Sequence, residues 1–132
     1  MALTTTKYNA CLEILAKNDW SDTGNNYAIQ VLNDSYTFDA SNTLFSDVSD
    51  YVIGSGQALV SRSISTAGTF TAADFNLNEA YTGARFIVVL LQTGAAITSL
   101  DNLVFCIDLG EVINLTVNDI VKLGNILTVA VV

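Results

Sequence analysis

The 132-residue sequence contains no histidine. Histidine is the most common general base, the usual partner of a catalytic serine or cysteine, and the most common transition-metal ligand. Its absence argues against most hydrolytic and metal-assisted mechanisms. We therefore expect a protein that is not an enzyme and that holds no cofactor and no metal.

Charged residues are also scarce, at 14% of the chain against about 25% in average soluble domains. Thirteen acidic and five basic residues give a net charge of −8. Nucleic acids and anionic membranes are bound by basic surfaces, so we expect neither as a partner. A surface with so few charges is either built from neutral polar residues or partly covered by other subunits, and we favour covering.

Long apolar runs are missing as well. The longest strongly apolar run spans residues 86–91, whereas a membrane-spanning helix needs roughly 20 residues. Residues 1–4 lack the hydrophobic stretch of a signal peptide. We expect no membrane insertion.

Only two cysteines are present, Cys11 and Cys106, and they lie far apart in the sequence. Two cysteines do not make the disulfide framework of a small secreted protein. Each lies among apolar residues, where a cysteine usually acts as a small hydrophobic side chain. We therefore expect two buried, reduced and unreactive thiols.

What the sequence does contain is abundant apolar residues, 51% of the chain, in short segments of β-type alternation. We expect one domain over residues 1–132, mainly β, with a sandwich or jelly-roll-like barrel architecture. A short helix is predicted over residues 7–17, with Thr6 as its N-cap, and a second helical turn near residues 48–52. Strands are predicted over residues 27–32, 58–65, 69–77, 84–91 and 103–109, followed by a meander over 112–117, 120–123 and 126–131.

The pattern also predicts which strand is central and where glycines interrupt or end strands. Residues 84–91 are apolar on both alternating faces, which predicts a strand in the middle of the core. Gly54 and Gly56 are expected to break the chain, and Gly110 is expected to end the strand that precedes it.

The segment from Asp19 to Gly24 partly matches a calcium-binding loop. Asp19, Ser21 and Thr23 provide oxygen ligands at the first, third and fifth positions, with glycine sixth. The twelfth position is Gln30, where the motif requires a bidentate glutamate, so we interpret this segment as a loop without calcium.

Other candidate sites have simpler explanations. The pairs Asp47 with Asp50 and Asp19 with Asp22 have a spacing compatible with a glycosidase, but thirteen acids in a loop-rich chain produce such pairs by chance. We interpret them as solvated surface. Aromatic residues suited to stacking on sugars are more often found in the core; they are Trp20, Tyr27, Tyr36, Tyr51 and Tyr81.

Several segments, in order, resemble small virion proteins of tailed bacteriophages, often described as head or decoration proteins. The resemblance spans residues 28–38 (AIQVLNDSYTF), 43–50 (TLFSDVSD), 58–64 (ALVSRSI), 70–75 (FTAADF), 82–90 (TGARFIVVL) and 107–110 (IDLG). Relative to that group, residues 54–57 are compressed and the C-terminal segment is unfamiliar.

This resemblance implies a non-enzymatic structural component of the virion, made in the host cytoplasm. A capsid decoration or cement protein bound to the major capsid protein or another virion protein is the first expectation. The alternative is a receptor- or carbohydrate-binding module of a tail or head fibre, and a hydrolase acting on cell-surface polymers ranks third.

The C-terminal segment, residues 126–132, is almost entirely apolar, so both faces of a strand formed there need covering. A neighbouring layer of the same domain would cover the second face, and so would another subunit. Because the chain has few charges, we expect a homo-oligomer, and the habits of phage decoration proteins suggest a trimer. The predicted interface residues are Ile126, Leu127, Val129 and Val131.

Overall fold

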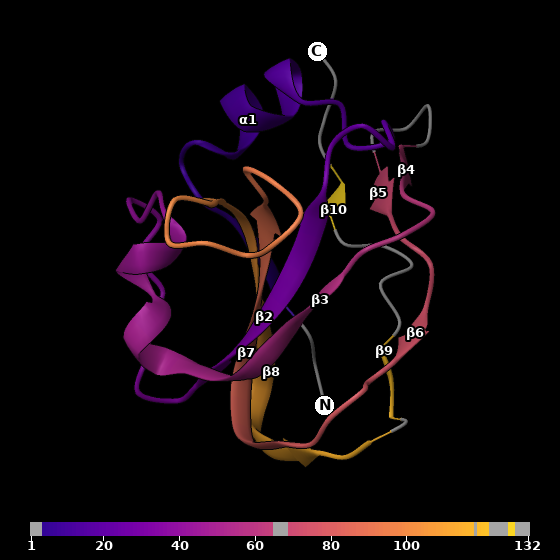
Figure 1. Cartoon of the computed structure of the whole chain (residues 1–132). Helices are drawn as coiled ribbons and strands as arrows, with labels where there is room; N and C mark the ends of the chain where they lie inside the picture. Colours follow the sequence, from indigo (N-terminus) through magenta and orange to yellow (C-terminus); the bar gives the residue numbers. More distant parts are fainter. Residues whose placement is uncertain (1–3, 65–68, 118, 122–126, 129–132) are drawn as a thin grey trace.

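A computed structural model describes residues 4–64, 69–117, 119–121 and 127–128 of the chain. The protein is mainly β, with one short helix, as the sequence predicts (Figure 1). The main sheet has five antiparallel strands in the order β1-β8-β7-β2-β3. These strands span Thr4–Lys7 (β1), Asn102–Leu115 (β8), Tyr81–Leu91 (β7), Tyr27–Asn33 (β2) and Val52–Ala58 (β3).

Two smaller groups of strands accompany the main sheet. One has the order β10-β5-β4, and the other pairs β6 with β9. Their strands span Leu127–Thr128 (β10), Thr69–Thr71 (β5), Ser63–Ile64 (β4), Phe75–Asn76 (β6) and Ile120–Val121 (β9). The described residues show neither a closed barrel nor a second sheet that completes a sandwich. The predicted C-terminal meander is wrong, because β9 and β10 pair with β6 and β5 and not with each other.

The middle strand of the main sheet is β7, which confirms the prediction for residues 84–91. Its side chains alternate between two apolar clusters, one on each face of the sheet. Ile87, Val89 and Leu91 belong to the first cluster, and Val88 and Leu90 belong to the second. A strand with both faces buried must be apolar at consecutive positions, and this is the pattern that identified it.

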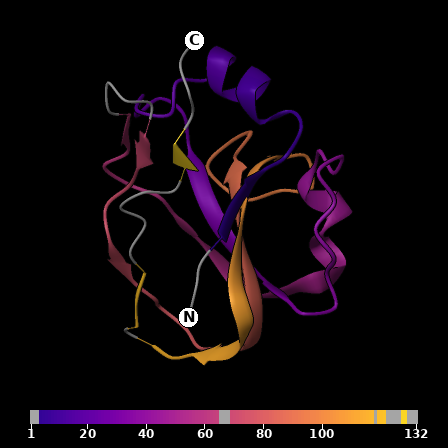
Figure 2. The ribbon, with the colours of Figure 1, turned by 180° about the vertical axis from the view of Figure 1, so that it is seen from behind.

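Different segments cover the two faces. The first face is covered by the helix α1 (Cys11–Lys17), by Trp20, and by the chain that carries Phe70 and Leu77. Two 3-10 turns, Phe45–Asp47 and Ser49–Tyr51, cover the second face and confirm the predicted second helical turn. Figures 1 and 2 show these turns and the β4–β6 segment on opposite sides of the main sheet.

The helix is shorter than predicted. It begins after Ala10, which is its N-cap, so Thr6 is not the cap. Thr6 lies instead in β1, opposite Cys106 of β8. The helix buries Cys11 and Ile14, whereas Leu12 is 50% exposed. Tertiary pairing with an edge of the sheet has overridden the local helical pattern in this segment.

The three glycines expected to break the chain or end a strand lie inside strands, Gly54 and Gly56 in β3 and Gly110 in β8. Gly54 has a φ of 64°, and Gly110 has a φ of 84°. Such a φ suits a glycine at a bulge, where a strand bends without ending. In β3 the bulge is large: Ile29 pairs with Gln57 and Val31 with Ile53, so residues 54–56 all face residue 30 of β2.

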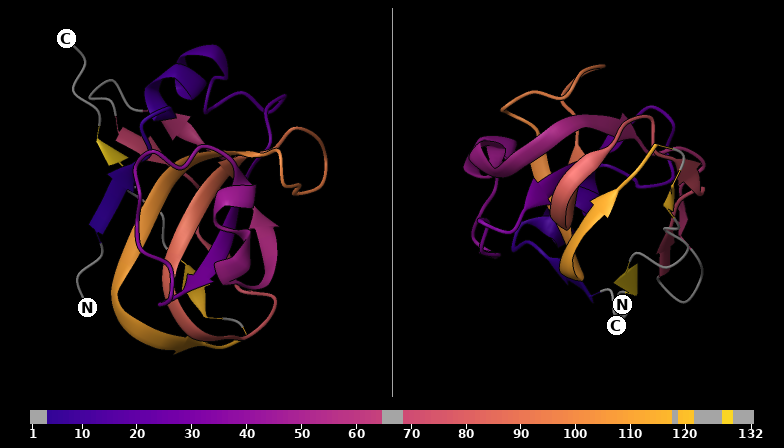
Figure 3. Two further views of the ribbon diagram at one scale, coloured as in Figure 1. Left: turned by 90° about the vertical axis from the view of Figure 1, so that its left-hand side faces the viewer. Right: turned by 90° about the horizontal axis from the view of Figure 1, so that it is seen from below.

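None of the helices in the described ranges has the length and apolar character that crossing a bilayer requires. The loop between β7 and β8, residues 92–101, projects from one end of the sheet (Figure 3).

Candidate functional site

The side chain of Arg62 joins two loops at one end of the main sheet. Its Nε donates a hydrogen bond to the Trp20 carbonyl at 2.7 Å, and its Nη1 donates to the Leu59 carbonyl at 2.8 Å. Its Nη2 donates to the carbonyls of Asp22, at 2.9 Å, and Asn25, at 2.5 Å. The loop before β2 is thus tied to the segment after β3.

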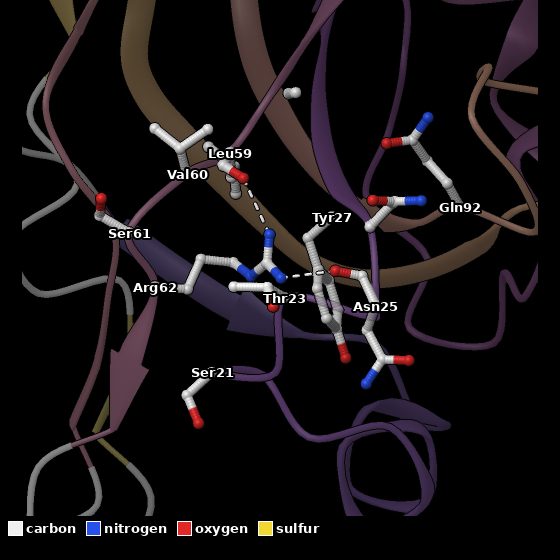
Figure 4. A pocket seen from close by; sticks show the side chains of 11 residues that line it. Ser21, Thr23, Asn25, Tyr27, Leu59, Val60, Ser61, Arg62 and Gln92 are labelled. Atoms are coloured by element: carbon white, nitrogen blue, oxygen red, sulfur yellow. Dashed lines mark hydrogen bonds between the residues drawn. The ribbon is translucent and has the colours of Figure 1, made fainter.

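The guanidinium also lies against aromatic rings, with its central carbon 5.0 Å from the centroid of Tyr27 and 5.8 Å from that of Trp20. Figure 4 shows it beside Tyr27, with the bonds to Leu59 and Asn25 dashed. Burial lowers the pKa of Arg62, yet the four carbonyls and the rings favour the cation. Arg62 therefore acts as a structural clasp.

A depression of about 260 Å³ lies beside this clasp. Its polar lining includes Ser21, Thr23 and Asn25 from the loop before β2, and Gln92 from the end of β7 (Figure 4). Arg62 is the one charged residue in the lining, and four of its five N–H groups are bonded to carbonyls. The depression is therefore mainly a neutral, hydrogen-bonding surface.

Two further depressions adjoin the first one, and Gln92 lines all three. The second, of about 460 Å³, lies at the β3 bulge and includes Gln30, Gln57 and Ile97. The third, of about 430 Å³, shares Asn25 with the first. We call the three depressions, which share lining residues, the Gln92 face.

The carboxamide of Gln30 differs from the others on the Gln92 face. The Gln30 residue is only 6% exposed, and its Oε1 atom is buried without a hydrogen-bond partner among the described residues. A buried oxygen without a donor is costly to the folded protein. Residues 54–57 of the β3 bulge line the second depression together with Gln30.

The loop of residues 92–101 is held from inside by Asp101, which is fully buried. One carboxylate oxygen accepts bonds from the backbone N–H and hydroxyl of Thr93 and from the hydroxyl of Thr98, at 2.9 to 3.2 Å. The other accepts the Thr98 backbone N–H at 2.8 Å. This ordered loop presents Leu100, which is 65% exposed, and borders the Gln92 face through Ile97.

The two cysteines are free and buried, as predicted, and lie on opposite faces of the main sheet. Burial raises the pKa of each thiol to about 12. A thiol with such a pKa is almost entirely protonated at neutral pH, and the thiolate is the reactive form. Cys11 and Cys106 are thus packing residues.

The acidic residues singled out from the sequence bond to nearby chain. Asp19 accepts bonds from the backbone and hydroxyl of Ser21, which lower its pKa. Asp22 accepts the Gly24 backbone N–H at 2.8 Å. Asp47 accepts the backbone N–H groups of residues 43 and 44, which lower its pKa. Asp50 is exposed.

These aspartates serve as turn and cap residues where the structure shows their bonds. Within the described ranges, no group of three or more acidic or cysteine side chains is arranged to hold a metal ion.

The aromatic residues considered for sugar stacking are mostly in the core. Trp20, Tyr27 and Tyr81 are fully buried, Tyr36 is 4% exposed, and Tyr51 is half-buried against the second cluster. The Trp20 indole donates to the Thr71 carbonyl at 2.8 Å. These rings therefore stabilise the fold and do not form an exposed stacking platform.

The predicted interface residues are described only in part. Leu127 lies in β10, where its backbone is paired opposite Phe70 of β5. Ile126, Val129 and Val131 lie outside the described residues.

Sequence reasoning missed the roles of Arg62, Gln30, Gln92 and Asp101. Most partners of Arg62 are distant in sequence, and the surroundings of Gln30 and Gln92 are assembled from several strands and loops. Asp101 bonds within its own loop, to Thr93 and Thr98, but no motif in that loop indicates this role. One signal was available for Arg62: it is a charged residue that closely follows the apolar pair Leu59 and Val60.

No protein-family model matches the chain, and no curated protein or solved structure matches it either.

Proposed function

We propose that this chain is a non-enzymatic structural protein of a tailed-phage particle, a decoration or cement protein that binds the major capsid protein or another virion protein. In this proposal the protein is made in the host cytoplasm and acts in the virion. It stabilises the particle by protein–protein contacts and performs no chemistry.

One observation carries this proposal: the side chains best suited to chemistry already have structural roles. Both thiols pack in the core, Arg62 ties two loops together, and Asp101 orders a third. Side chains committed in this way give a rigid scaffold that presents its loops in a fixed arrangement, as a cement protein requires.

The surface is suited to protein contacts. Apolar side chains exposed on separate segments include Leu12, Val60 and Leu100, and neutral polar residues surround the Gln92 face. Neutral groups lose their water at less cost than charges do. The resemblance to phage head proteins, from about residue 12 to residue 110, agrees with this use.

Particle composition tests the proposal. Phage particles are purified from the host that carries the gene, and the chain is quantified relative to the major capsid protein by mass spectrometry. We expect a fixed stoichiometry, and loss of ordered surface density in particles made without the gene. Particles that lack the chain, or that are unchanged in structure and stability by its deletion, would refute a structural role.

We also propose a homo-oligomer, with a trimer as the first model, in which residues 126–132 contribute to the interface. Light scattering on the full chain and on a chain ending at residue 125 tests this. A larger mass for the full chain supports it, and a monomer at high concentration that remains monomeric on the particle contradicts it.

The sandwich or jelly-roll architecture expected from the sequence is part of the proposal. Its second layer would be built on β4, β5 and β6. Phe70 of β5 and Leu77, which follows β6, both belong to the first apolar cluster. An experimental structure with those strands continuous in one second sheet would establish it. A structure in which they remain separate pairs would overturn it.

A further inference from the structure

We propose that the Gln92 face binds a neutral carbohydrate chain, with its three adjoining depressions as successive binding sites for sugar units. This binding activity goes beyond the structural role proposed above and does not depend on it.

The chemistry of the lining is the first argument. Besides Gln92, the depressions contain Asn25, Asn26, Gln30, Gln57 and Asn102. A carboxamide both donates and accepts hydrogen bonds, as a sugar hydroxyl does, so the two groups pair in either direction. Hydroxyl side chains lie among these amides. The three depressions together match a ligand that carries many hydroxyl groups.

The charge of the lining is the second argument. Across the three depressions Arg62 is the one charged residue, and its donors are largely bonded to carbonyls. The whole chain carries a net charge of −8, which repels anions. A neutral glycan meets neither repulsion nor the cost of stripping water from a charge.

A peptide that adds a strand to the sheet is less well supported. The outer edge of β3 lies beside the second depression, and its backbone at Ser55 is already paired. The Ser55 N–H donates to a Glu79 carboxylate oxygen at 2.5 Å, and the Tyr81 hydroxyl donates to the Ser55 carbonyl at 2.6 Å. Strand addition requires a row of unpaired backbone groups, and here the row is interrupted.

Gln30 is the independent observation that points to a ligand. Gln30 lines the second depression, and its carboxamide oxygen is buried without a hydrogen-bond donor among the described residues. The Ile97 side chain and the Gln30 amide nitrogen both approach the position that a Cβ on Gly56 would occupy. The Ile97 side chain therefore lies next to the carboxamide, and in the proposed complex it moves aside so that a sugar hydroxyl reaches the unpaired oxygen.

The test uses the full chain labelled with ¹⁵N and titrated with short oligomers of neutral hexoses and of N-acetylhexosamines, which are first screened on a glycan array. We expect saturable shifts of amide signals on the Gln92 face. Gln92→Ala should weaken binding about tenfold, the effect of losing roughly one good hydrogen bond. Asn9→Ala, which removes an exposed carboxamide outside the three depressions, is the matched control and should bind normally.

A second variant separates binding from folding. Gln30→Met keeps the length of the side chain and removes the unpaired oxygen. We expect it to bind the oligosaccharide severalfold more weakly and yet to unfold at a higher urea concentration, because a buried polar atom without a partner has been removed. A merely structural glutamine would not show these opposite changes.

Four results would overturn the proposal, and three of them concern binding directly. They are the absence of shifts on the Gln92 face with any neutral oligosaccharide, unchanged affinity in Gln92→Ala, and binding of acidic sugars alone. Burial of this face between copies of the chain, detected as protected amides together with a larger mass, would assign it to self-association and also overturn the proposal. The structural role is tested separately, by particle composition. Its failure can therefore be distinguished from a failure of carbohydrate binding.

Discussion

Replacing Arg62 tests whether its hydrogen bonds hold the loops around the candidate site together. Arg62→Met keeps the aliphatic part of the side chain but removes all four bonds to carbonyl groups. Three of those bonds are partly buried, and the bond to the Asp22 carbonyl is exposed. With about 1 kcal/mol of net stability for each partly buried bond, we expect a loss of about 3 kcal/mol.

The shape of the side chain should matter as much as its charge. Arg62→Lys retains a positive charge, but an ammonium group cannot reproduce the planar fork that serves carbonyls of Trp20, Leu59 and Asn25 at once. We therefore expect Arg62→Lys to recover only a minor part of the loss.

Urea unfolding measures these effects, followed by the fluorescence of Trp20, the one tryptophan in the chain, and in parallel by circular dichroism. Arg85→Met is the matched control, because Arg85 bonds to one partner, the carboxylate of Asp108, and does not join two loops. Such pairs contribute little to stability. If Arg62→Met lowers the free energy of unfolding no more than Arg85→Met does, Arg62 does not hold the two loops together.

Three further predictions concern other parts of the fold. Gly56→Ala should destabilise the protein by about 1–3 kcal/mol, measured by urea unfolding, because its Cβ would lie 2.5 Å from a carbonyl oxygen of β2; Gly94→Ala, whose Cβ meets nothing within 4 Å, should not. The folded pKa of Asp47 is below its ordinary value of 3.8 because of backbone hydrogen bonds. The ionised Asp47 therefore contributes its full stabilisation above pH 3.8, and this contribution is lost as pH falls through the folded pKa. We expect the urea midpoint of Asp47→Asn to decrease less than that of the unmodified protein between neutral pH and about pH 3. Cys11 and Cys106 should react with a thiol reagent only after unfolding; rapid labelling of the native protein, or a bridge between them in its mass spectrum, would contradict their burial.

The sequence alone predicted the features that depend on local apolar pattern. The central strand was found because consecutive apolar residues require two buried faces, and β7 has them. The burial of Cys11 and Cys106 followed from their apolar neighbours. The short helical turns near Val48 were found from their spacing.

Tertiary structure decided the features whose partners lie far away in the chain. Residues 4–7 join the sheet because β8 offers them a free edge, which the local helical pattern does not reveal. Gly54 and Gly110 bend strands without ending them, because pairing with the neighbouring strand resumes beyond each bulge.

The candidate site depends most on the tertiary structure. The bonds from Arg62 to Trp20, Asp22 and Asn25 join residues that are separated by 37 to 42 positions in the sequence. Gln30, whose side-chain oxygen is unpaired, lies opposite the bulge of β3, and Gln92, the residue after β7, lines all three depressions of the Gln92 face. Apolar periodicity is a property of neighbouring residues, so it can be read along the chain; a hydrogen-bond partner is selected by distance in space, which exists only once the sheet has formed.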